Sequence, residues 1–118
     1  MWTYRQSTGE LSQSVTHVGN GYAGTGAGRN NPAMQHVKRT GPIPRGIYAI
    51  GPAYKHPHLG PICMNLEPDP VNEMFGRDAF RMHGDNPAGD ASLGCIVMGP
   101  SIRKLVSVSK DRKLQVVE

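Results

Sequence analysis

The chain has 118 residues, a formal net charge of +4 and a pI of about 9.3. This length fits one domain spanning residues 1–118, and 37% hydrophobic with 19% charged residues argues against a disordered chain. The excess of basic residues favours an anionic partner, but the sequence contains no nucleic-acid-binding motif. Two cysteines are too few for a disulfide scaffold. No segment is apolar for long enough to be a signal peptide or to insert into a membrane.

The pattern of apolar residues and turns predicts a mostly-β domain with one or two short helices. Strands are predicted over residues 2–5, from Leu11 onward, 15–18, 47–50, 62–66, 79–83, 95–98 and 114–117. Residues 19–32 are rich in glycine and asparagine and predict a long loop, and 84–91 form a turn-rich loop. Ser101 is the expected N-cap of a short helix that ends near Ser109.

A cysteine and a histidine lie where two predicted strands meet. His83 ends one strand, Cys95 opens the next, and the loop between them allows the strand ends to approach. A cysteine nucleophile needs a base such as histidine, and Gly94 leaves room for backbone N–H groups that stabilise an oxyanion. The same residue types also fit a buried core cysteine and a structural histidine, so spacing alone leaves both interpretations open.

Several linked motifs resemble known families. The order His83, a loop and then Ser-Leu-Gly-Cys-Ile at 92–96, together with Ile-Pro-Arg-Gly-Ile-Tyr at 43–48, is similar to the L,D-transpeptidase (YkuD-like) family. The chain resembles the Tlde1-like (DUF2778) type VI secretion effectors more closely still. The motifs shared with that branch are Trp-Thr-Tyr at 2–4, Gly-Tyr-Ala-Gly at 21–24, Asn-Asn-Pro at 30–32, Gly-Pro-Ile-Pro-Arg-Gly-Ile-Tyr at 41–48 and the cysteine box at 92–96.

The resemblance implies a compact L,D-transpeptidase-like β-sandwich and assigns roles within it. Cys95 would be the nucleophile and His83 its base, with no metal or cofactor. Backbone N–H groups of Gly94 and Cys95 would form the oxyanion hole. Ser92 would support the site by hydrogen bonding, and the Gly84 carbonyl would orient the imidazole.

The resemblance also implies an antibacterial toxin that acts on peptidoglycan. Its activity would be L,D-carboxypeptidase or L,D-transpeptidase (D-amino acid exchange) chemistry on tetrapeptide stems. Its partners would be the stem peptides, a cognate immunity protein and the type VI secretion apparatus. Such a protein would be made in the cytoplasm without a signal peptide and would act in the periplasm of the target cell.

The sequence departs from the broad family beside the cysteine. Leu93 replaces a histidine, and Val97 stands where arginine or asparagine is common. Arg81 should share a strand face with His83 because strand side chains alternate, so it is a candidate for binding a substrate carboxylate. An exposed, salt-bridged arginine is the alternative.

Two other functions fit the cysteine box. One is a different cysteine peptidoglycan hydrolase, an amidase or endopeptidase of NlpC/P60 type, although those place the cysteine before the histidine. The other is a non-catalytic wall-binding module. Cys63 is interpreted as a packing residue, with a Cys63–Cys95 disulfide as the alternative.

Overall fold

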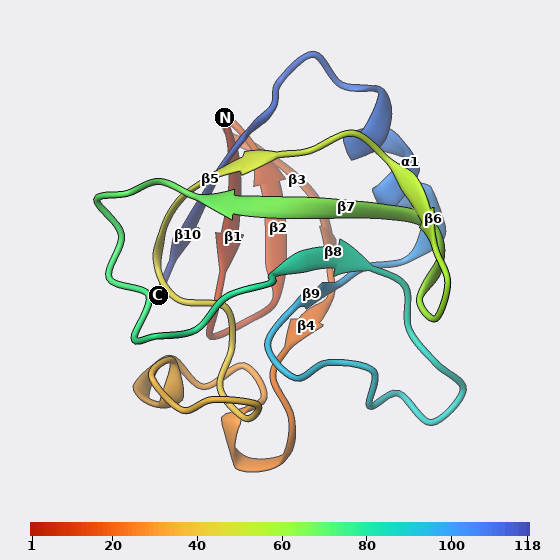
Figure 1. The fold of residues 1–118 in the computed structure, drawn as a ribbon. Coiled ribbons are helices and arrows are strands. Elements are labelled where there is room, and N and C mark those ends of the chain that lie inside the picture. Colours follow the sequence, from red (N-terminus) through yellow and green to blue (C-terminus); the bar gives the residue numbers. More distant parts are fainter.

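The computed structural model describes residues 1–118, and it is mostly β (Figure 1). The strands are β1 (Trp2–Arg5), β2 (Glu10–Gln13), β3 (Thr16–Asn20), β4 (Tyr22–Ala23), β5 (Gly46–Ile50), β6 (Tyr54–His56), β7 (Gly60–Pro68), β8 (Arg81–His83), β9 (Ile96–Val97) and β10 (Lys113–Val117). The helices are α1 (Pro100–Val108) and two 3-10 turns, η1 (Gly26–Gly28) and η2 (Pro32–Met34). The prediction of a mostly-β chain with few helices is confirmed.

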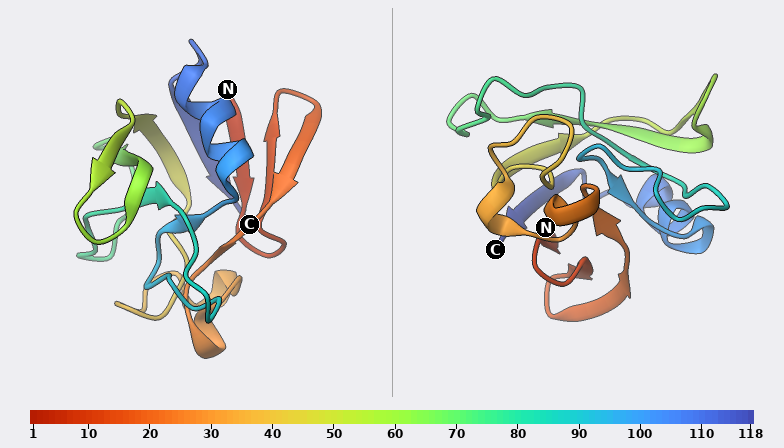
Figure 2. Two further views of the ribbon diagram at one scale, coloured as in Figure 1. Left: turned by 90° about the vertical axis from the view of Figure 1, so that its right-hand side faces the viewer. Right: turned by 90° about the horizontal axis from the view of Figure 1, so that it is seen from below.

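The strands form one nearly closed sheet whose halves face each other across the core (Figures 1 and 2). Its order is β3-β2-β1-β10-β5-β7-β8-β9-β4, with β6 paired to β7 outside this path. Two neighbours are parallel, β1 with β10 and β8 with β9. The first of these pairs joins the two ends of the chain, and the second carries the candidate site.

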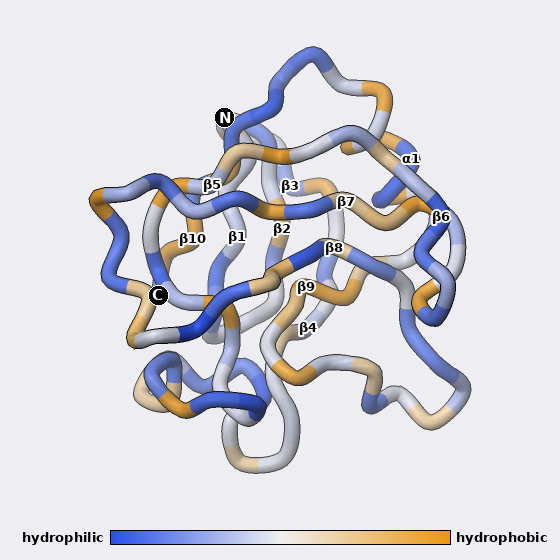
Figure 3. The backbone as a smooth tube through the Cα atoms, in the orientation of Figure 1, coloured by the Kyte–Doolittle hydropathy of each residue, from blue (hydrophilic) through white to orange (hydrophobic).

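One cluster of 16 buried residues fills the space that the sheet encloses. Strand alternation supplies it: in β10, Leu114 and Val116 are buried, whereas Lys113 and Gln115 are exposed. Figure 3 shows hydrophobic and hydrophilic residues alternating along β7 and a mostly hydrophilic β8. No helix combines the length and apolar character that a membrane crossing needs.

Three local predictions differ from the structure. The segment 19–32, expected as a loop, contains the end of β3 and the short strand β4, which pairs with β9 beside the cysteine box. The strand β6 was not predicted. The helix N-cap is Gly99 and not Ser101, because Pro100 occupies the first helical position, where its missing N–H leaves no hydrogen bond unmade.

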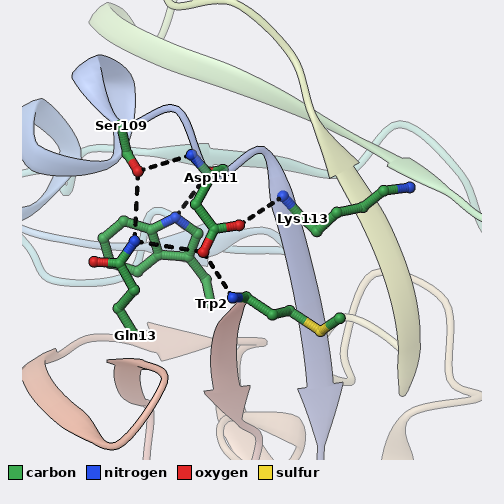
Figure 4. A network of polar contacts seen from close by, with 6 residues as sticks. Trp2, Gln13, Ser109, Asp111 and Lys113 are labelled. Atoms are coloured by element: carbon green, nitrogen blue, oxygen red, sulfur yellow. Dashed lines mark hydrogen bonds and ion pairs between the residues drawn. The ribbon is translucent and has the colours of Figure 1, made fainter.

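The indole of Trp2 links the first strand to the last connection of the chain (Figure 4). Its ring is 2% exposed, and Nε1 donates to the Asp111 carbonyl at 3.0 Å. Asp111 continues the network: its N–H donates to Ser109 Oγ, and its carboxylate accepts from the Lys113 N–H. The network fixes the segment between α1 and β10 against β1.

We expect Trp2→Ala to lower the free energy of unfolding by about 3–5 kcal/mol, because it removes a large buried ring and leaves a cavity. Trp2→Phe keeps most of the packing but loses the indole donor, and should have the smaller effect. Far-UV circular dichroism during urea unfolding measures both, because Trp2 is the only tryptophan. The control is Val15→Ala at a fully exposed position. A Trp2→Ala protein that unfolds with the wild-type midpoint would contradict this account.

Candidate active site

The parallel pairing of β8 with β9 brings His83 and Cys95 to one sheet face. Met82 pairs with Ile96 and His83 with Val97, and Cys95 directly precedes β9. Paired residues of neighbouring strands point to the same side, and so do residues two apart in one strand. By this alternation Cys95, two residues before Val97, falls on the same face as His83, although the lining of the cleft that contains Cys95 does not include His83.

His83 is poised as a neutral imidazole. Its ring is 2% exposed, and Nδ1 lies 2.7 Å from the Gly84 carbonyl oxygen. A carbonyl only accepts, so Nδ1 carries the proton and the lone pair of Nε2 is left to act as a base. Burial lowers the pKa of His83, and the charges of Arg103 and Arg81 lower it further, against the opposing effects of Gly84 and Asp85. The expected role of Gly84 matches this geometry.

Cys95 is partly buried at the wall of a cleft of about 460 Å³. Its Sγ lies 3.9 Å from the Ala79 carbonyl oxygen and forms no hydrogen bond with His83. Burial raises the pKa of Cys95, and a backbone contact and the charge of Arg81 oppose that rise. The resting pair is therefore a thiol and a neutral imidazole. Catalytic hydrogen bonds of free enzymes often tighten only when substrate binds.

The hydroxyl of Ser92 shapes the turn before the cysteine. Ser92 is fully buried; its Oγ accepts from Gly24 N at 2.9 Å and from Gly94 N at 3.0 Å, and it donates to the Cys95 carbonyl at 2.6 Å. The supporting role expected for Ser92 fits these contacts. The oxyanion-donor role expected for Gly94 does not, because its N–H is already bound to Ser92.

Gly94 is instead required by the shape of the turn. Its φ is +139°, and a Cβ at this position would lie 2.5 Å from a nitrogen of Arg77. The N–H of Cys95 has no hydrogen-bond partner. Of the two backbone donors expected from the sequence, the N–H of Cys95 is therefore the one left free for a ligand.

Arg77 is a residue that the sequence analysis missed. Its side chain is buried, and its guanidinium donates to the carbonyls of Gln35, Gly41, Pro42 and Leu93. The first three belong to the loop before β5, and Leu93 belongs to the cysteine box, so one cation ties the two loops together. It forms no salt bridge, and its charge acts to lower the pKa of Cys95.

Arg81 is held in place at the cleft by neutral groups. Its Nε donates to Tyr54 Oη at 3.1 Å, and Tyr54 Oη donates to Asn65 Oδ1 at 2.6 Å. Arg81 lines the same cleft as Cys95 and pairs with no carboxylate. The salt-bridged surface arginine considered from the sequence is not what the structure contains.

Cys63 is fully buried in β7, and both cysteines are free thiols. The Cys63–Cys95 disulfide considered from the sequence is absent. The packing position expected for Cys63 agrees with its complete burial.

Arg77→Lys and Arg77→Gln should both destabilise the protein by roughly 1–3 kcal/mol, because neither side chain presents a planar fork that reaches several carbonyls. Urea unfolding followed by Trp2 fluorescence measures the change. Arg5→Gln, at an exposed arginine, is the control. If the Arg77→Lys protein were as stable to urea as the wild type, the positive charge alone, and not the hydrogen bonds to several carbonyls, would explain how Arg77 stabilises the protein.

The rate of alkylation of Cys95 by iodoacetamide should keep rising with pH beyond about 8.5, the ordinary thiol pKa, because burial raises the pKa of Cys95. Intact-protein mass spectrometry over a pH series measures the rate, and a Cys63→Ser variant removes the second thiol. A rate that is already constant near pH 7 would instead indicate a thiolate–imidazolium pair in the resting protein.

A comparison with known protein families identifies the family of this chain. The model of the Tlde1 domain matches residues 17–117, which contain most of β3, all of β4 to β10 and both candidate residues. No curated protein and no solved structure matches the chain. The chain therefore belongs to the Tlde1 domain family and is a type VI secretion effector toxin.

Proposed function

We propose that this toxin is a cysteine enzyme of the L,D-transpeptidase type, with Cys95 as nucleophile and His83 as base, acting on peptidoglycan tetrapeptide stems. The observation that supports it best is the contact of His83 Nδ1 with the Gly84 carbonyl at 2.7 Å. This contact leaves Nε2 as the basic nitrogen, on the sheet face that also carries Cys95.

The first half-reaction would form a thioester. As the sulfur of Cys95 attacks the carbonyl carbon of the third stem residue, its proton passes to His83 Nε2. The N–H of Cys95 would donate to the oxyanion. Collapse of the tetrahedral intermediate breaks the peptide bond, and His83 returns the proton to the amine of the departing D-Ala.

The second half-reaction would decide the product. Attack by water on the thioester releases a tripeptide stem and makes the protein an L,D-carboxypeptidase. Attack by the amine of a free D-amino acid gives exchange, and attack by a neighbouring stem gives a cross-link. In each case His83 would deprotonate the incoming group, and the thiol of Cys95 would be restored.

The proposed substrate determines where the toxin would act and which partner proteins it would need. Peptidoglycan stems lie in the periplasm, so the toxin would be delivered there by the type VI secretion apparatus. A cognate immunity protein would protect the producing cell. The simplest way to do so is to cover the cleft beside Cys95.

Mass spectrometry of purified muropeptides tests the proposal. Wild type should remove D-Ala from tetrapeptide stems, or replace it by an added D-amino acid. Cys95→Ala should abolish both products, because it removes the nucleophile, and His83→Gln should reduce turnover by at least 100-fold, because it removes the base. Thermal unfolding of each variant controls for folding.

Other products would point elsewhere. Cleavage at another peptide bond or at the glycan–peptide amide, lost in Cys95→Ala, would favour an NlpC/P60-type hydrolase. No change in any muropeptide would contradict the enzyme and favour a wall-binding module.

A further inference from the structure

The wall of the Cys95 cleft carries much more positive than negative charge. Four of its lining residues are cations, Lys38, Arg39, Arg77 and Arg81, and Asp78 is its one acidic residue. None of the five takes part in a salt bridge. A concave wall with one sign of charge concentrates ligands of the opposite sign.

The four cations are not equivalent. Arg77 is buried and its donors are used by backbone carbonyls, whereas Arg81 is held by Tyr54 beside the sulfur. Lys38 and Arg39 are exposed, and their side chains make no hydrogen bond within the protein. They are the two cations whose donors are wholly available to a ligand.

The turn that carries Lys38 and Arg39 is fixed against the cleft. The carbonyls of Gln35, Gly41 and Pro42, which flank the turn on both sides, accept from the Arg77 guanidinium. Arg39 holds a left-handed backbone with φ +60°, which is uncommon outside glycine.

The side chain of Lys38 extends toward Gly76, which lies in the connection between β7 and β8. Its Nζ lies 3.7 Å from the point where a Cβ on Gly76 would be. The Lys38 ammonium therefore stands at the cleft wall beside Gly76.

We infer that the Lys38–Arg39 turn is a second carboxylate-binding element, so that the cleft selects an acyl donor with at least two free carboxylates. This rests on the proposed function. Arg81, next to the sulfur, would bind one carboxylate, and the turn would bind another carried by an adjacent residue of the stem. A stem containing a diamino-dicarboxylic acid carries such a second carboxylate, and amidation removes its charge.

A pair of alkylating agents tests the charge of the cleft without using peptidoglycan. Iodoacetate is anionic and iodoacetamide is neutral, and both transfer the same carbon to the thiolate of Cys95. The iodoacetate-to-iodoacetamide rate ratio should fall about threefold to tenfold in a Lys38→Gln/Arg39→Gln double variant. It should also fall in wild type as salt is raised. Lys110→Gln, an exposed cation outside the cleft, is the matched control.

A pair of substrates tests the selection itself. Wild type should turn over free-acid tetrapeptide stems with a kcat/KM at least tenfold above that for stems amidated at the side carboxylate. The Lys38→Gln/Arg39→Gln double variant should lose most of this preference, because the free-acid stem loses its binding partner. Equal turnover of the two stems by wild type would overturn the inference.

The two experiments separate this inference from the proposed function. An unchanged alkylation ratio in the double variant would overturn the anion site even if stems are processed. A lowered ratio without turnover of any stem would support an anion-binding cleft and count against the acyl-transfer activity.

Discussion

The site depends on one buried cation. Arg77 has no carboxylate partner, and the desolvation of its charge is offset by carbonyl dipoles from two loops that share no strand pairing. Because the guanidinium is planar and its donors point in different directions, it fixes the positions of the two loops relative to each other. The turn at Gly94, the cleft wall beneath Cys95 and the Lys38–Arg39 turn all follow from this arrangement.

The second constraint is strand register. β8 and β9 are short, and a slip of one residue would turn Cys95 to the other face of the sheet, away from His83. The neighbours prevent such a slip. β7 pairs with β8 on one side and β4 pairs with β9 on the other, with Tyr22 opposite Val97. The glycine-rich segment after β3 thus contributes directly to the position of Cys95.

Sequence reasoning succeeded where the signal lies in side-chain periodicity or in a compact motif. The alternation in β10 predicts a strand, and the strand that ends at His83 pairs with the strand that directly follows Cys95. It failed for hydrogen bonds in which one of the two groups belongs to the backbone. Arg77 binds carbonyls, which no residue pattern records, and Gly94 N–H is diverted by Ser92. The two-residue strand β4 is too short to show alternation at all.

The electrostatics of the site favour one timing of proton transfer. Burial favours the neutral forms of both His83 and Cys95, so a separated thiolate–imidazolium pair is disfavoured at rest. The nearby arginines favour the thiolate, but a carboxylate-bearing substrate would neutralise part of that effect as it binds. For the anionic acyl donor proposed above, a preformed thiolate would therefore be disfavoured. On the proposed mechanism the proton would leave Cys95 as the carbon–sulfur bond forms, and the N–H of Cys95 would donate to the oxyanion that develops on the substrate carbonyl.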